Sequence, residues 1–266
     1  MKLINDMMNL SGKTALVTGG AGHIGASIAH ALAEANASIV VIDKNRDASS
    51  QTINELPRND RQHHSSWQYD ITSEQSVAEL KEKLIETYGR LDILVNCAAL
   101  VGDSTLTGWA VSFENQGLEA WNRAIEINIT SCFLLSRTLL PLLRANKSGS
   151  IINIASIYGV YGQKPEMYES TDYMTPAAYA VSKGGMVQFT RYLASIVGPE
   201  VRANTISPGG VFRGHSTEFV EAYTKHTSMK RMATEDDFKG AALYFASELS
   251  AHATGQNLVI DGGWGL

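Results

Sequence analysis

Tyr179 and Lys183 are the residues of this chain whose types and spacing most directly suggest chemistry. The phenol and the ammonium are four positions apart, so on a helix they share one face, one turn apart. A free phenol has a pKa of about 10 and is a poor base at neutral pH. A positive charge about 4 Å away, at an effective dielectric near 20, is worth up to ~4 kcal/mol. Such a charge would lower the phenol pKa by about two or three units, into a useful range. Taken alone, the spacing also suits a solvated pair on a helix surface.

The composition is that of a folded protein with no marked charge bias. The chain has 266 residues and a formal net charge of −5. It contains no linker, repeat or low-complexity tract, which favours one domain over residues 1–266. No basic block or arginine-rich face is present, so no nucleic-acid partner is expected.

The sequence also gives no sign of a membrane or metal partner. No apolar run reaches membrane-spanning length, and Lys2 and Asp6 interrupt the place of a signal-peptide core. Cys97 and Cys132 stand in apolar surroundings without metal-ligand spacing. We interpret them as buried free thiols of a reducing compartment, which favours the cytoplasm, and we expect no metal site.

Strand and helix patterns alternate along the chain. Strands are predicted at Lys13–Thr18, Ser38–Asp43, Leu91–Asn96, Ser150–Ala155, Arg202–Ser207 and Asn257–Ile260. Helices are predicted at Ile24–Ala35, Glu74–Tyr88, Gly117–Arg144, Ala177–Val197 and Glu235–Glu248. This order predicts an α/β fold, a doubly wound and mostly parallel sheet with helices on both faces. Three stretches lack periodicity and are expected to border the ligand crevice as loops: Leu100–Asn115, Tyr158–Pro176 and Gly210–Met232.

A glycine-rich turn follows the first predicted strand. Gly20, Gly22 and Gly25 satisfy Gly-x-Gly-x-x-Gly, a pattern that suits a tight strand-to-helix turn and the close approach of a pyrophosphate. Asp43 ends the second strand 18 residues after Gly25, where a carboxylate can accept hydrogen bonds from an adenosine ribose. Together they predict a dinucleotide site. The alternative to a binding site is a purely structural turn, with Asp43 at the surface.

These features, with others in the same order, resemble the short-chain dehydrogenase/reductase family over nearly the whole chain. The matching segments are Tyr69-Asp70-Ile71, Val95-Asn96-Cys97-Ala98, Glu126-Ile127-Asn128, Ile154-Ala155-Ser156, Ser207-Pro208-Gly209 and Asp261-Gly262-Gly263, besides the Tyr179–Lys183 pair. The resemblance implies a single Rossmann domain with a seven-stranded sheet. It also implies homo-oligomers, tetramers or dimers, built through the helices Gly117–Arg144 and Ala177–Val197.

The resemblance further implies an oxidoreductase that interconverts a secondary alcohol and a ketone by hydride transfer. Tyr179 would be the general acid/base, Lys183 would lower its pKa and hold the nicotinamide ribose, Ser156 would orient the substrate, and Asn128 would support a relay water. The implied cofactor-binding residues are Gly19, Gly22, His23, Ile24, Gly25, Asp43, Asp70, Ile71, Asn96, Ala98, Tyr179, Lys183, Pro208, Gly209 and Val211. Asp43 would repel a 2′-phosphate, so NAD is expected as the cofactor, while Lys44 and Arg46 keep NADP possible.

The chain departs from the family pattern at three places. His23 stands where a glycine is expected, and it could touch a phosphate or pack beside the turn. Two segments are extended and should lie above the nicotinamide: Tyr158–Pro176, with an acidic stretch near Glu166–Asp172, and the region of Trp109, Phe113 and Trp121.

The substrate is the least determined part of the interpretation. Four segments resemble family members associated with surface-sugar (nonulosonate) synthesis, which favours a sugar-like or sugar-phosphate substrate: Ala155–Gly159, the acidic stretch near Glu166–Asp172, Thr190–Ser195 and the ending Asp261-Gly262-Gly263-Trp264. An anionic group could meet Lys164, Arg213, His215 or Lys225, each of which could equally be a surface charge. The main enzymatic alternative is a 3-oxoacyl thioester (acyl-carrier-protein) reductase. Alternatives of other classes are a non-catalytic dinucleotide-binding regulator and a methyltransferase, which would leave the intact Ser156, Tyr179 and Lys183 set unexplained.

Overall fold

The computed structural model describes residues 1–101, 106–168 and 174–266. Its centre is one seven-stranded sheet in the order β3-β2-β1-β4-β5-β6-β7, in which every neighbouring pair is parallel. The strands are β1 (Thr14–Thr18), β2 (Ser38–Ile42), β3 (Ser65–Trp67), β4 (Ile93–Asn96), β5 (Gly149–Ile154), β6 (Val201–Pro208) and β7 (Asn257–Ile260). The predicted doubly wound parallel sheet is thereby confirmed.

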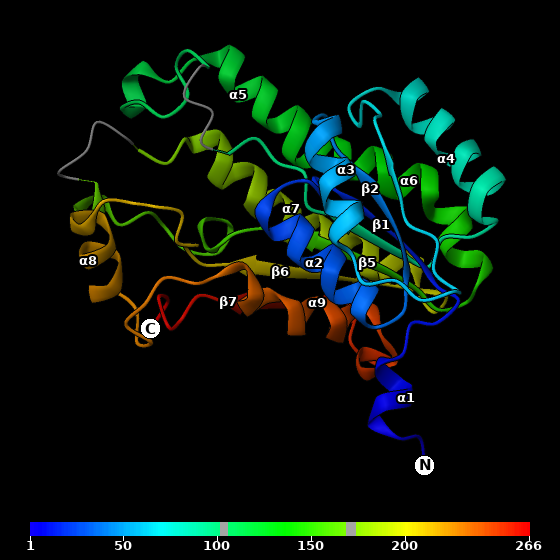
Figure 1. Ribbon diagram of the computed structural model, residues 1–266. Coiled ribbons are helices and arrows are strands. Elements are labelled where there is room, and N and C mark those ends of the chain that lie inside the picture. Colours follow the sequence, from blue (N-terminus) through cyan, green and yellow to red (C-terminus); the bar gives the residue numbers. More distant parts are fainter. Residues whose placement is uncertain (102–105, 169–173) are drawn as a thin grey trace.

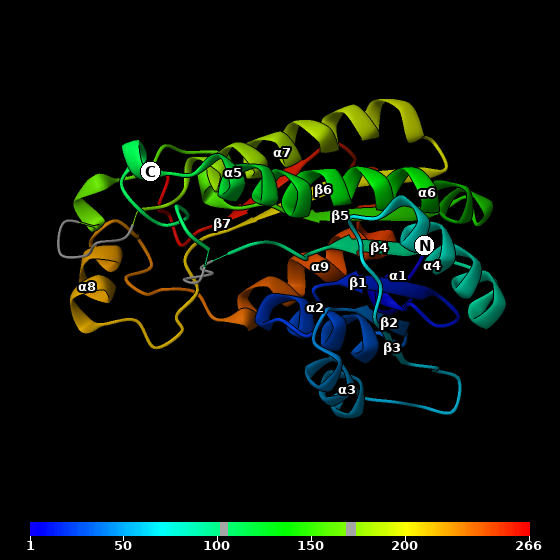
Figure 2. The ribbon, with the colours of Figure 1, turned by 90° about the horizontal axis from the view of Figure 1, so that it is seen from above.

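Helices cover both faces of this sheet (Figures 1 and 2). One face carries α2 (His23–Glu34), α3 (Arg46–Glu55) and α9 (Lys239–Ala246), and the other carries α4 (Glu74–Tyr88), α6 (Ser131–Ala145) and α7 (Ala177–Val197). Alternate strand residues feed the two cores, because successive side chains point to opposite faces of a strand. Val17 packs with α2 and α9, whereas Leu16 packs with the α4, α6 and α7 layer.

The register of the strands brings their carboxyl ends to one edge. Thr18 of β1 lies opposite both Ile42 of β2 and Asn96 of β4, and Asn96 in turn lies opposite Asn153 of β5. The segments that follow these strands therefore meet at one crevice, as is usual for open α/β sheets.

The predicted helix Gly117–Arg144 contains an irregularity. Helix α5 (Leu118–Ile125) continues through a π-helical turn (Glu126–Thr130) into α6. By length and composition alone, the 28-residue stretch Leu118–Ala145 could cross a membrane. Arg123 and Glu126 interrupt it, however, and the leucines of α6 pack in the sheet core, so we assign it as a core helix.

Several elements were not predicted. They are α1 (Ile4–Met8), β3, α3 and α8 (Thr217–Lys225), and short 3₁₀ turns at Phe113–Asn115, Ile157–Gly159, Pro165–Met167 and Glu248–Ser250. The predicted helix Glu235–Glu248 begins as a 3₁₀ turn, Glu235–Phe238, and continues as α9. The prediction of a loop over all of Gly210–Met232 was wrong because Ser216 caps α8, its hydroxyl accepting a hydrogen bond from the Phe219 amide. Parts of the two other predicted loops, residues 102–105 and 169–173, lie outside the described residues, including Glu169 and Asp172 of the acidic stretch.

Candidate active site

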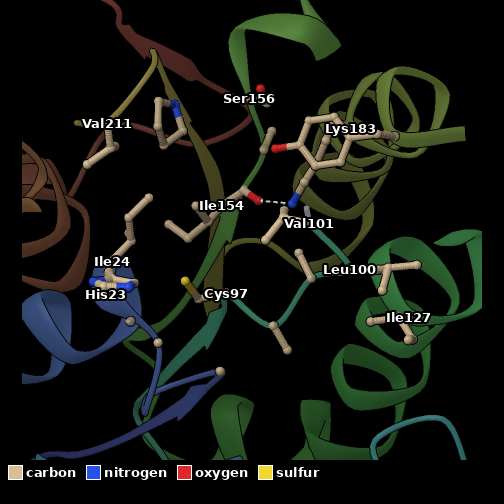
Figure 3. A pocket seen from close by; sticks show the side chains of 18 of the residues that line it. His23, Ile24, Cys97, Leu100, Val101, Ile127, Ile154, Ser156, Lys183 and Val211 are labelled. Carbon is tan, nitrogen blue, oxygen red and sulfur yellow. Dashed lines mark hydrogen bonds between the residues drawn. The ribbon is translucent and has the colours of Figure 1, made fainter. Parts of the chain in front are cut away.

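A cavity of about 780 Å³ opens at the carboxyl edge of the sheet. Its size suits a small-molecule or cofactor site. Figure 3 shows His23 and Ile24 on one wall, Ser156 and Lys183 on the opposite wall, and Cys97 between them. All the predicted site residues line this cavity except Asn96 and Asn128, which are buried behind it.

The glycine turn forms a cradle that side chains would fill. Gly19 has a φ of +64°, and a Cβ there would lie 2.8 Å from the backbone of Ala98. A Cβ on Gly25 would lie 2.2 Å from the Gly19 carbonyl oxygen. Gly22 caps α2, whose first backbone N–H groups and positive dipole end therefore begin at this turn. These residues fit the diphosphate of a dinucleotide, whereas Gly20 packs against Val41 and lies outside the cavity wall.

Two carboxylates mark the end of the cavity nearest β2. Asp43 accepts hydrogen bonds from the backbone amides of Ala21, at 3.2 Å, and Asn45, at 3.0 Å. Asp70 accepts from the hydroxyl of Thr72 at 2.7 Å and from its amide at 2.9 Å, and these bonds lower the pKa of Asp70. Both carboxylates are thus fixed in place, which suits recognition of the hydroxyl groups of an adenosine.

The opposite end holds Ser156, Tyr179 and Lys183. Ser156 follows β5, and Tyr179 and Lys183 lie in the first two turns of α7. The Lys183 ammonium is 2% exposed and donates to the Ile154 carbonyl at 2.7 Å (Figure 3). It lies 5.8 Å from the centroid of the Tyr179 ring. The Ser156 hydroxyl lies close enough to the phenol of Tyr179 to act on its pKa, so an alcohol or ketone at this wall could meet both groups.

The pKa of Tyr179 differs from the expectation drawn from its spacing to Lys183. Burial raises the pKa of Tyr179, while the hydrogen bond from Ser156 and the charge of Arg213 act in the opposite direction. Burial likewise lowers the pKa of Lys183. The structure therefore differs from the predicted lowering of the phenol pKa by Lys183, because burial of the phenol is the largest effect on its pKa.

Asn128 and Asn96 are buried in the protein interior. The Asn128 carboxamide accepts from the Leu100 amide at 2.6 Å and donates to the Ser182 hydroxyl at 3.1 Å. It lies in the π-helical turn, and such turns occur often at functional sites. Asn96 donates to Asn153 at 2.8 Å beneath the cavity. Neither residue forms the cavity wall, so the predicted roles of Asn96 and Asn128 place them behind the ligand-facing surface.

An aromatic group above Ser156 was missed from the sequence. Tyr158, Tyr168, Phe219 and Tyr223 line the cavity, and the Tyr158 and Tyr168 hydroxyls are 2.7 Å apart. On α8, Phe219 and Tyr223 are four positions apart, and this spacing could have indicated one apolar face turned inward.

Of the cations considered for an anionic ligand, Arg213 and His215 line the cavity, whereas Lys164 and Lys225 do not. Lys164 instead lies 4.5 Å above the Trp264 ring and donates to the Trp264 carbonyl.

The other extension contributes less to the cavity than predicted. Trp109 is buried against Ala120 and Ala178 in a cluster that also contacts Tyr179. Phe113 and Trp121 are exposed and do not line the cavity, so their predicted place above the nicotinamide was wrong.

Comparisons with known proteins agree with this site. A family model described as enoyl-(acyl carrier protein) reductase matches residues 19–265. A short-chain dehydrogenase from Leptospira borgpetersenii, solved with bound NAD+, is 30% identical, with a TM-score of 0.84 over 100% of this chain and 97% of its own. This chain belongs to the short-chain dehydrogenase/reductase family. Like other family members, this dehydrogenase/reductase is an NAD(P)-dependent enzyme.

Two curated relatives indicate the breadth of the family. The post-translational flagellin modification protein A of Campylobacter coli is 28% identical over 259 residues, 97% of this chain and 100% of its own. The rhamnolipids biosynthesis 3-oxoacyl-[acyl-carrier-protein] reductase of Pseudomonas aeruginosa is 32% identical over 271 residues, 97% of this chain and 98% of its own. The family is thus certain, while these two relatives act in different contexts.

Proposed function

We propose that this enzyme interconverts a secondary alcohol and a ketone on a sugar-like substrate, with Tyr179 as the general acid/base. The observation that carries the proposal is the meeting of the Ser156 and Tyr179 hydroxyls on the cavity wall, with the Lys183 ammonium beside the phenol. Proton exchange needs the acid/base within hydrogen-bond reach of the reacting oxygen, and two adjacent hydroxyls satisfy that need.

The cofactor is proposed to be NAD. The residues that would hold it are the Gly19–Gly25 turn, Asp43 and Asp70 at the adenosine, and Lys183 with Pro208–Val211 at the nicotinamide end. When bound, the nicotinamide accepts or gives the hydride, and its oxidised ring adds a positive charge to the site. Asp43 supports NAD over NADP because its fixed carboxylate would repel a 2′-phosphate.

The protein's own part in the reaction is proton transfer and orientation. In the oxidising direction, Tyr179 takes the proton of the substrate hydroxyl, and in the reducing direction it returns a proton to the ketone oxygen. Ser156 holds that oxygen and lowers the pKa of the phenol. Asn128 is proposed to support the exchange of this proton from behind, by fixing Leu100 and Ser182.

A sugar-like substrate is supported by the aromatic and hydroxyl side chains that line the cavity and by one relative. Hydroxyl groups of Tyr158 and Tyr168 stand beside aromatic rings, a combination that suits a polyhydroxylated compound with apolar ring faces. The relative from C. coli is a flagellin modification protein, which agrees with a role in surface-sugar chemistry.

A second candidate is 3-oxoacyl thioester reduction. It is favoured by the relative from P. aeruginosa, which is named as such a reductase. The two candidates separate in one assay, in which NAD-linked oxidation of sugars, sugar acids and sugar phosphates is measured beside the reduction of acetoacetyl thioester with NADH and NADPH. Activity on the sugar panel alone would support our proposal, and faster thioester reduction would overturn it.

The enzyme is further proposed to be a cytoplasmic homo-oligomer, a tetramer or a dimer. Apolar side chains are exposed on α6 and α7, among them Phe133, Val181, Tyr192 and Ile196, and a partner copy would cover them. Cys97 and Cys132 are free thiols, which agrees with a reducing compartment.

A further inference from the structure

Arg213 is a cation of the cavity wall that shares Glu235 with His23 of the glycine turn and whose charge reaches Tyr179. It lies five residues after Pro208 of β6 and lines the cavity together with Tyr179 and Ser156. Its charge lowers the pKa of Tyr179 and that of Cys97, so it acts on the reacting end of the site. The mechanism proposed above gives Arg213 no role.

Glu235 holds this guanidinium by one edge. The Nε atom of Arg213 lies 3.4 Å from Oε1 of Glu235, and the same oxygen lies 3.6 Å from Nδ1 of His23. The Arg213 side chain is 35% exposed and Glu235 is 28% exposed, so solvent screens the pair only in part. The two terminal nitrogens of Arg213 donate no hydrogen bond to any of the described residues. A guanidinium whose Nε is held by Glu235 and whose two terminal nitrogens have no acceptor in the described part of the chain suits the bidentate binding of a carboxylate or phosphate.

The surroundings of Arg213 favour an anion. The aromatic and aliphatic residues Phe219, Tyr223 and Met232 line the same end of the cavity. Burial and the charge of Arg213 lower the pKa of His215, which favours its neutral imidazole. Arg213 is then the cation that an anionic ligand would meet. The acids that line the cavity among the described residues are Asp43 and Asp70, both at the far, adenosine end.

Among the described residues of the cavity wall, the other cation beside Tyr179 is Lys183, which already has a hydrogen-bond partner. Lys183 is buried and donates to the Ile154 carbonyl. A negative group on the substrate would therefore find its partner at Arg213.

We propose that Arg213 anchors a carboxylate or phosphate of the substrate and that Glu235 positions it for that contact. The substrate class is then an anionic secondary alcohol or ketone, such as a sugar acid or a sugar phosphate. This inference rests on the proposed function, because the anion must belong to the molecule that reacts at Tyr179.

The test uses matched pairs of substrates that differ in one anionic group. A sugar acid is compared with the corresponding neutral sugar alcohol, and a sugar phosphate with the free sugar, in the parent enzyme and in Arg213→Gln, Arg213→Lys and Arg191→Gln. The control Arg191 is an exposed arginine of α7 that contacts Gln188 and lies outside the cavity. The two pairs also show whether the anion is a carboxylate or a phosphate.

The expected result is a loss confined to the anionic member. Removal of one partner of such a pair should lower kcat/KM for the anionic substrate by about 30-fold or more in Arg213→Gln. The neutral substrate should change by less than about 3-fold, and Arg213→Lys should retain part of the selectivity. Glu235→Gln should reduce the ratio of anionic to neutral kcat/KM without abolishing turnover, which a merely structural role would not do.

Cofactor affinity, measured by calorimetry, supplies a readout besides activity. If Arg213→Gln weakens the binding of NAD as much as it lowers kcat/KM, Arg213 serves the cofactor diphosphate and the proposal is overturned. An equal loss for neutral and anionic substrates would overturn it as well.

If the parent enzyme oxidises no member of the panel, the proposed function fails while the anchor is still tested. Inorganic phosphate and acetate are then titrated into the NAD-saturated protein. Binding that Arg213→Gln abolishes and Arg191→Gln retains supports the anchor, and binding that is absent or equal in all variants contradicts it.

Discussion

Replacement of Gly25 by alanine should destabilise the enzyme, because the first turn of α2 packs against the backbone of the glycine turn. The new Cβ would lie 2.2 Å from the Gly19 carbonyl oxygen and 3.0 Å from the Gly20 Cα, both backbone atoms. Backbone cannot rotate away as a side chain can, so the turn and α2 must separate by roughly 1 Å. Overpacking of this kind costs about 1–3 kcal/mol.

Gly240→Ala is the matched control for this substitution. Gly240 lies in α9, the neighbour of α2 on the same face of the sheet, and a Cβ there meets no atom within 4 Å. Alanine is favoured over glycine in a helix by about 0.5–1 kcal/mol, so this variant should gain stability. The substitution of glycine by alanine should thus lower the free energy of unfolding at α2 and raise it at α9, two helices on the same face of the sheet.

Urea unfolding at one protein concentration measures both effects, and calorimetry measures NAD affinity in parallel. We expect a lower midpoint and weaker NAD binding for Gly25→Ala, and a higher midpoint with unchanged binding for Gly240→Ala. Equal midpoints for the two variants, with parental NAD affinity in Gly25→Ala, would refute the close-packed turn.

Three further outcomes follow from the electrostatics of the site and of its support. Because burial raises the pKa of Tyr179, kcat/KM for oxidation should rise with pH up to the alkaline limit, and Ser156→Ala should shift this limb to higher pH by removing the bond that opposes the rise. Asp43→Asn should raise kcat/KM for NADP relative to NAD by about 10-fold, from removal of ~1–2 kcal/mol of repulsion; an unchanged ratio would exclude Asp43 as the selector. Asp237 is paired with Arg231 at 2.6 Å, and this contact lowers its pKa, so the stabilisation is present at neutral pH and declines as the pH falls below about 4. Asp237→Asn should therefore lose about 1 kcal/mol in urea unfolding at pH 7, with a smaller difference from the parent at pH 3.

The sheet and the main helices could be predicted because their signals are local. The predicted bounds of Glu74–Tyr88, Ala177–Val197 and Asn257–Ile260 are those of the structure. Apolar periodicity decides such elements, and the alternation of strands and helices fixes a parallel sheet. Strand β3 was missed because three residues with two serines carry no such signal.

Most of the site could be predicted for the same reason, since its residues follow the strand ends in a fixed order. Chain order does not encode how a side chain is used in space. Asn96 directly precedes the wall residue Cys97 in the sequence, yet strand pairing directs its amide to Asn153. The direction of the Tyr179 pKa could not be predicted from the sequence. It depends on burial of the phenol, and the Lys183 ammonium is held by the Ile154 carbonyl; both follow from tertiary packing.

His23, which stands in place of a glycine expected in the turn, contacts a residue distant in the sequence. Its place in the turn suggested a phosphate contact or local packing, while the structure gives it a cavity-lining position beside Glu235. Glu235 lies 212 positions further along the chain, and only the fold brings the two together. Arg213 shares the same carboxylate oxygen.

The central claim, that Tyr179 exchanges the proton in an NAD-dependent oxidoreduction, is tested most directly by Tyr179→Phe. The variant removes one hydroxyl from a half-buried ring that packs near Trp109, so the fold should be retained. With a substrate that the parent enzyme oxidises, kcat should fall by about 10²–10⁴-fold, while the affinity for NAD by calorimetry stays within about 3-fold of the parent. Turnover close to that of the parent, at equal NAD affinity, would contradict the account.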